Sequence, residues 1–247
     1  VGADEPMDAK FSLGQYIYAN RSASSSFATN GFMIAASYRL IDQQAEGARR
    51  HNLSFGLQMG IVNKTIFPEK FTYDVQYSVY SGDGFDRSIA SGETFARQSY
   101  FDLNVNFGAY YRFSTRNRKL CAYGGFAMYN ITRPNEALLD NGGFSDLPLR
   151  VVLHAGAIFV ASPLVRVQPL LLYMNQAGAH EFNVGTLIYY RVERTPYEPL
   201  YGLSLRNGDA IVFQLGMRYQ EITVKAGYDV ITSYLKSFRN KGAEFSL

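Results

Sequence analysis

The chain has 247 residues, of which 47% are hydrophobic and 15% aromatic, with 19 Tyr, 18 Phe and no Trp. This length, without the Leu, Ala, Lys and Glu blocks of helical proteins, favours one all-β domain and disfavours a helix bundle. The net charge is only +3 and basic residues are scattered at turns, so nucleic-acid binding has no support. A single cysteine, Cys121, excludes an internal disulfide framework.

Apolar and polar residues alternate along most of the chain, which predicts β-strands joined by short turns. In chain order we expect an irregular polar lead-in over residues 1–9, and then twelve strands at 11–20, 27–41, 51–62, 100–114, 120–132, 149–161, 164–175, 181–192, 199–206, 209–220, 222–234 and 241–247. Several of them are much longer than the roughly five or six residues usual in soluble sheets. Asn207-Gly208 is a strong hairpin signal, because both central residues of a type I′ turn need positive φ.

The strand at 100–114 shows the alternation most clearly. One face carries apolar side chains and the other polar ones or glycine, with Phe101, Leu103, Val105 and Phe107 opposite Asp102, Asn104, Asn106 and Gly108. Twelve strands with an inward apolar face would enclose a lumen too wide for side chains to fill. We therefore predict an all-β fold, an antiparallel transmembrane β-barrel in the bacterial outer membrane, with its apolar face toward lipid. A soluble β-sandwich, lipocalin-like barrel or jelly roll also has alternating strands and is the alternative.

Two connections are long, at 63–99 and 133–148, and both follow odd-numbered strands of the predicted series. Connections after even-numbered strands are mostly short. Outer-membrane barrels place long loops at the cell surface and short turns in the periplasm, which predicts the orientation of this chain. Within the first long connection the segment FTYDVQYSVY also alternates, and it predicts an extra hairpin or a plug folded into the lumen.

Residues suited to catalysis or metal binding are few. The only histidines, His51, His154 and His180, occur at no metal-ligand spacing and in no catalytic motif. Asp83 and Asp86 miss the spacing of a calcium-binding loop. We expect no enzymatic activity, no cofactor and no metal site.

Several segments carry a resemblance to a known family: VGADEP at 1–6, FTYDVQY at 71–77, ITRPNEALL at 131–139, DLPLRVVLHAG at 146–156, LRNGDAIVFQLGM at 205–217, AGYDVITSYL at 226–235 and GAEFSL at 242–247. They resemble, in order, the PorP/SprF family of outer-membrane proteins from Bacteroidota. The resemblance implies a barrel of about fourteen strands, an even number as in other bacterial barrels. Residues 1–247 would then form a single outer-membrane domain, with N-terminal strands and a C-terminal tail lying beyond them.

The resemblance also implies a non-enzymatic role in type IX secretion and gliding motility. SprF-like members are similar to partners of large surface adhesins, a cargo that they are expected to help deliver or retain through its C-terminal domain. PorP-like members tie periplasmic secretion machinery to the outer membrane through a peptidoglycan-binding lipoprotein. The expected surroundings and partners are therefore outer-membrane lipid or lipopolysaccharide and either a type IX secretion protein or an adhesin C-terminal domain.

Exposed apolar residues in the long connections are the candidate partner-binding residues, because clustered apolar groups on a wet surface usually bind something. They are Phe67, Phe71, Tyr73, Tyr77, Tyr80 and Phe85 in the first connection, and Leu138, Leu139 and Phe144 in the second. Self-packing or lumen plugging would also account for them. The competing function is an outer-membrane diffusion channel or a transporter of hydrophobic substrates, which bilayer conductance would reveal, with a pore lined by Arg112, His154, Arg218, Lys225 and Asp229.

Overall fold

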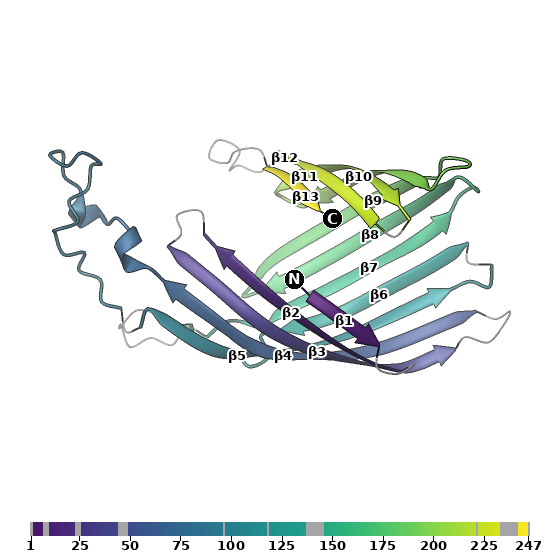
Figure 1. The fold of residues 1–247 in the computed structure, drawn as a ribbon, viewed down its shortest axis with the longest axis horizontal. Helices are drawn as coiled ribbons and strands as arrows, with labels where there is room; N and C mark the ends of the chain where they lie inside the picture. The colour runs from purple at the N-terminus through teal and green to yellow at the C-terminus, as the bar shows by residue number, and fades with distance from the viewer. Residues whose placement is uncertain are drawn as a thin grey trace. The chain divides into compact units, whose positions relative to one another are not determined.

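The computed structural model describes residues 2–6, 10–22, 26–43, 49–95, 97–117, 119–136, 146–220, 222–232 and 242–246. Within these residues, thirteen strands form one antiparallel sheet in which each strand lies beside its neighbours in sequence (Figure 1). They are β1 (Gly2–Pro6), β2 (Phe11–Arg21), β3 (Phe27–Gln43), β4 (Arg50–Ile66), β5 (Ser99–Ser114), β6 (Leu120–Tyr129), β7 (Arg150–Val160), β8 (Val165–Gln176), β9 (Ala179–Tyr190), β10 (Tyr197–Arg206), β11 (Ala210–Tyr219), β12 (Ile222–Ile231) and β13 (Gly242–Ser246). Two short 3-10 helices, η1 (Pro68–Lys70) and η2 (Asp74–Gln76), follow β4.

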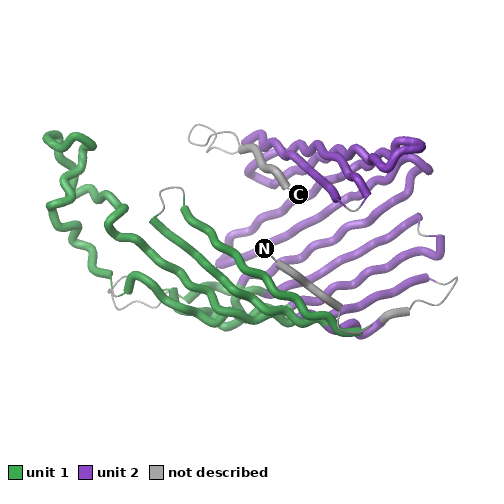
Figure 2. The backbone as a smooth tube through the Cα atoms, in the orientation of Figure 1, with its two compact units in different colours: residues 1–37, 57–107, 129–149 green, residues 38–56, 108–128, 150–247 purple. Residues whose placement is uncertain are grey.

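The chain divides into two compact units (Figure 2). Unit 1 comprises residues 1–37, 57–107 and 129–149, and unit 2 comprises residues 38–56, 108–128 and 150–247. Four of the boundaries between the units fall within the continuous strands β3, β4, β5 and β6, and the fifth directly precedes β7. The expected single domain over the whole chain stays a prediction.

Large apolar side chains in unit 2 lie on the exposed face of the sheet. In the β10–β11 and β11–β12 ladders, Leu203 pairs with Phe213 and Phe213 pairs with Tyr228, and all three are exposed. The opposite face carries Gln214, Arg218 and other polar residues or glycines, together with the buried Leu200 and Val212. A soluble sheet would bury its apolar face, so this arrangement indicates that lipid is the solvent of that face.

In unit 1, strand β5 likewise has its apolar face exposed and polar residues buried on the other face. Phe101 is 74% exposed, whereas Asn104 retains only 8% of its accessible surface. The buried amides are paired, because Asn104 Nδ2 donates to Asn130 Oδ1 at 2.8 Å and Asn106 Nδ2 donates to Gln58 Oε1 at 2.7 Å. The predicted all-β fold is confirmed, and its apolar-out, polar-in pattern fits an outer-membrane β-barrel. Among the residues described, no helix has the length and hydropathy needed to span a membrane.

The twelve predicted strands correspond in order to β2–β13, but the predicted irregular lead-in is wrong. β1 pairs with β2 from Gly2↔Tyr16 to Pro6↔Ser12. Its short polar sequence carries no alternation, so backbone pairing with β2 determines its conformation. The predicted end of the strand at 120–132 is also too late, because Asn130 has a φ of 61° and the ladder of β6 stops at Tyr129.

Aromatic rings on the polar face of unit 2 lie over glycines of the neighbouring strand. A Cβ added to Gly125 in β6 would lie 2.2 Å from Cε1 of His154 in β7. Conversely, a Cβ added to Gly156 in β7 would lie 2.5 Å from the Tyr123 hydroxyl in β6. Each of the two strands therefore places one aromatic ring over a glycine of the other strand. Tyr110 stacks on His154 with centroids 6.1 Å apart.

Candidate functional site

The long connection between β4 and β5 is attached at its base to unit 1. Ile66 N donates to Gln98 O at 2.8 Å, which closes the connection where it leaves the two strands. Phe67 N donates to Ser26 O at 2.9 Å. The Phe71 ring packs edge-on against Phe27, with centroids 5.6 Å apart. These contacts fix the position of η1 and the residues that follow it.

Beyond this base the connection folds into a short hairpin. Asp86 N donates to Gln76 O at 2.7 Å, Ser78 N donates to Gly84 O at 3.0 Å, and Tyr77 forms a bridge with Phe85. Gly84 has a φ of +81°, a conformation that favours glycine. The hairpin that the alternation predicted is therefore present, but it is short because η2 interrupts the extended backbone before Tyr77.

Side-chain hydrogen bonds hold the two ends of this hairpin. The buried amide of Gln76 donates to Ile89 O at 2.8 Å and accepts from Tyr73 N at 3.3 Å. Asp86 Oδ1 accepts from Ser88 Oγ at 2.6 Å and from Ser88 N at 3.0 Å. Both Ser88 bonds favour the charged carboxylate, and they hold the pKa of Asp86 below its ordinary value.

The turn of the hairpin and the residues before it present apolar side chains to solvent. Tyr80 is 96% exposed, Val79 72% and Tyr77 66%, and Val75 is also exposed. We call these four residues the tip. The segment extends past the ends of β4 and β5 (Figure 1). Apolar side chains that the described chain leaves uncovered are a feature of binding surfaces.

The predicted partner-binding residues divide by exposure. Tyr77 and Tyr80 belong to the tip, whereas Phe67, Phe71, Tyr73 and Phe85 are half-buried. Phe71 packs on Phe27, and Phe85 packs on Tyr77 with centroids 6.1 Å apart. Val75 and Val79 were not predicted as contacts, although their place in the alternation was a usable signal. Leu138, Leu139 and Phe144 lie outside the described residues.

The second long connection contacts the base of the first. Glu136 forms an ion pair with Lys64 of β4, and Arg97 Nη2 donates to Asn135 O at 2.7 Å. Asn135 also forms a bridge with Asp146. An ion pair and a hydrogen bond therefore join the bases of the two connections within unit 1, and the tip extends from this joined base.

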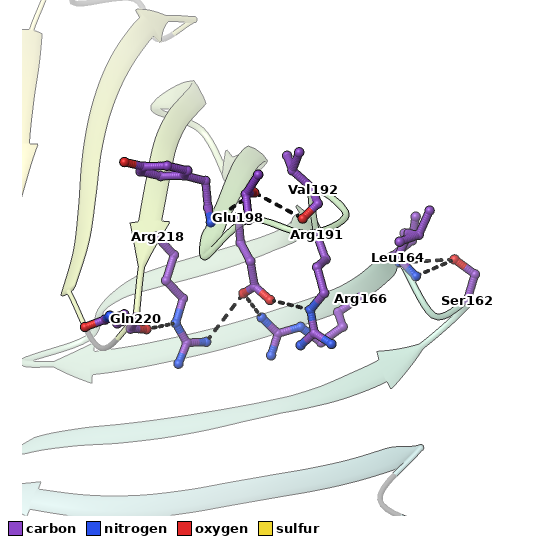
Figure 3. A network of polar contacts seen from close by, with 11 residues as sticks. Ser162, Leu164, Arg166, Arg191, Val192, Glu198, Arg218 and Gln220 are labelled. Atoms are coloured by element: carbon purple, nitrogen blue, oxygen red, sulfur yellow. Dashed lines mark hydrogen bonds and ion pairs between the residues drawn. The ribbon is translucent and has the colours of Figure 1, made fainter.

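A second candidate site lies in unit 2 and is polar. In it, three arginines surround one glutamate (Figure 3). Glu198 forms ion pairs with Arg166, with Arg191 at 3.1 Å and with Arg218 at 3.9 Å. Arg218 Nε also donates to Gln220 O at 3.0 Å. We call these four charged residues the arginine cluster. They line a cavity of about 320 Å³ together with Thr195, Pro196 and Gln220.

Strand register explains why these residues meet. Glu198 of β10 pairs directly with Arg218 of β11. On its other side, β10 pairs with β9 through Leu200↔Tyr189, and continuing this register places Arg191 opposite Glu198. Arg166 of β8 pairs with Tyr189 and lies over its ring at 5.2 Å. The cluster thus combines side chains of β8, β10 and β11 with Arg191, which directly follows β9. Sequence reasoning identified only Arg218.

The other residues predicted for chemistry are dispersed and engaged in local contacts. His51 Nδ1 is 2.7 Å from the Tyr111 hydroxyl, and His180 Nδ1 is 2.8 Å from Asn175 Nδ2. In the described parts of the chain, no three His, Cys, Asp or Glu side chains come together as a metal site. Among the predicted pore-lining residues, Arg112 donates to Cys121 Sγ and Asp229 pairs with Arg206.

Comparison with known proteins gives one family. The family model described as type IX secretion system membrane protein PorP/SprF matches residues 1–247, the whole chain. No match was found among curated proteins.

Proposed function

Because the chain belongs to the PorP/SprF family of type IX secretion system membrane proteins, we propose that it is a docking component that binds a protein partner at the tip of its β4–β5 connection. The family is one of secretion-system membrane proteins, and the all-β antiparallel sheet fits an outer-membrane β-barrel. In this function the barrel is the anchor and the hairpin is the contact. The observation that carries the proposal is the exposure of Tyr80 and Val79 on a hairpin that is closed by backbone hydrogen bonds.

The energetics support a partner that covers the whole tip. Full burial of one large apolar side chain stabilises by about 1.5–3 kcal/mol, so four of them supply on the order of 6–12 kcal/mol. Micromolar binding requires about 8 kcal/mol net, and association itself costs several kcal/mol. A partner must therefore bury most of the tip together, and the hydrogen bonds that hold the hairpin lower the entropy cost of doing so.

The expected orientation of the barrel bears on which partner this is. If the long connections face the cell surface, the tip lies outside the cell. A secreted adhesin, bound through its C-terminal domain, could reach it there, whereas periplasmic machinery would meet the short turns at the other end. We therefore favour the surface cargo as the partner.

The test is affinity purification of the protein from native outer membranes in mild detergent, comparing the wild type with the Val79→Ser/Tyr80→Ser variant. We expect the variant to lose its co-purifying type IX secretion partner or adhesin, because two of the most exposed apolar side chains are removed. Ile89→Ser is the matched control, since Ile89 is an exposed apolar residue outside the hairpin. Undiminished co-purification with the double variant would contradict the proposal.

A further inference from the structure

We propose that the cavity of the arginine cluster binds a ligand oxyanion, a carboxylate or a phosphate group, in addition to any partner held at the tip. The cavity lies on the polar face of unit 2, at the end where β8 begins and β9 and β11 end. Neither the family description nor the sequence motifs assign a site there.

Charge stoichiometry is the first observation. Three guanidinium groups converge on one largely buried carboxylate, that of Glu198 (Figure 3). One carboxylate balances one guanidinium, so two positive charges of the cluster are left without a counter-charge inside it. In the β9–β10 connection, Glu193 is followed by Arg194, so this neighbouring pair adds no net charge. Further along the chain, Asp209 forms an ion pair with Arg206, and Glu221 lies outside the described residues.

The geometry of the donors is the second observation. Arg191 reaches Glu198 Oε1, whereas Arg166 and Arg218 approach Glu198 Oε2. Guanidinium groups present five N–H donors in a planar fork that matches carboxylates and phosphates. Glu198 accepts only part of this donor capacity. It therefore serves as a tethered carboxylate that orients the arginines and leaves other N–H groups for a second oxyanion.

The size of the cavity is the third observation. Its volume of about 320 Å³ is larger than a phosphate or carboxylate group alone requires. Ligand pockets in proteins start at roughly 300 Å³, so there is space for the oxyanion and part of the molecule that carries it. Thr195 and Gln220 add uncharged polar groups to the wall. The expected orientation of the barrel places this cavity at the periplasmic end.

The experiment measures binding of inorganic phosphate and, separately, of succinate to the intact protein in detergent at low ionic strength, by calorimetric titration. We expect saturable binding of at least one anion. Binding of phosphate alone would identify the ligand's oxyanion as a phosphate group. Binding of succinate alone would identify it as a carboxylate. Absence of saturable binding of both anions overturns the proposal.

The variant that tests the site is Arg191→Gln, and its matched control is Arg194→Gln. Both remove one positive charge from the same connection, but only Arg191 lines the cavity. We expect about tenfold weaker binding for Arg191→Gln and less than a twofold change for Arg194→Gln. If both variants weaken anion binding equally, the anion is attracted by the general positive field and not by a defined site, and this result overturns the proposal. If Arg191→Gln does not fold, Arg191→Lys keeps the charge but loses the fork, and unchanged affinity in that variant overturns the proposal as well.

Discussion

Gly125 gives the sharpest test of how the polar face of unit 2 is packed. The Cβ of an alanine at this position would lie 2.2 Å from His154 Cε1 and 2.7 Å from His154 Nε2. Such contacts are far inside van der Waals distance, so the imidazole must move away. At the adjacent Gly124 the nearest atom is His154 O at 3.5 Å, an ordinary contact. Gly124→Ala is therefore a control on the same strand, one residue away.

The expected cost comes from the displaced ring. Forcing extra volume into a packed site costs about 1–3 kcal/mol. Moving His154 also disturbs its stacking on Tyr110, and an aromatic pair contributes about 0.5–1.5 kcal/mol. Counting the loss of stacking as part of the overpacking cost, we expect Gly125→Ala to lose about 1–3 kcal/mol of unfolding free energy. Gly124→Ala should stay within about 0.5 kcal/mol of the wild type.

The assay is urea unfolding of the protein in lipid vesicles, followed by the mobility difference between folded and unfolded barrel on cold gels. His154→Ala is made in both backgrounds, so that a double-mutant cycle isolates the contact. Without the imidazole, Gly125→Ala should cost almost nothing. If it costs as much in the His154→Ala background as in the wild type, the ring contact is not the cause and the reasoning is refuted.

Two further predictions concern other parts of the chain. A Cβ on Gly60 would lie 2.1 Å from Phe32 O, a backbone atom that cannot move aside as a ring can. We therefore expect Gly60→Ala to give no folded band on cold gels. A normal folded band would contradict this. The Ser88 hydrogen bonds lower the pKa of Asp86, so their stabilisation of the hairpin is present above the ordinary carboxyl pKa of about 3.9 and is lost as pH falls through the lower value. An NMR pH titration should place the Asp86 midpoint below that ordinary value in the wild type and closer to it in Ser88→Ala, and a wild-type midpoint at or above it would contradict the hydrogen-bond assignment.

The strands were predictable from sequence because their signal is local. Alternation with period two follows directly from strand geometry, and each of β2–β13 was expected in order. The short strand β1 was missed because its residues do not alternate and its structure depends on pairing with β2. The end of β6 was misplaced because the positive φ of Asn130 is a single-residue property that alternation does not report.

The sites were less predictable because they depend on register. Glu198 and Arg218 are twenty residues apart in sequence, and only the β10–β11 pairing brings them opposite each other. The pairing of Gly125 with His154 likewise requires two neighbouring strands and one ring orientation. Tyr77 and Tyr80 of the tip were easier to find, since the hairpin is formed by residues close in sequence.

Two ionic networks of opposite composition lie on the polar face of β10. Near its start, Glu198 has three arginine partners, and at its end Arg206 has three acidic partners, Glu181, Asp209 and Asp229. The two centres are eight residues apart along β10, about 26 Å, which exceeds the Debye length of about 8 Å in physiological salt. Neither network can therefore neutralise the other. An anionic group is repelled at the Arg206 end and attracted at the Glu198 end, so it should enter from the side of the short turns, which the expected orientation places in the periplasm.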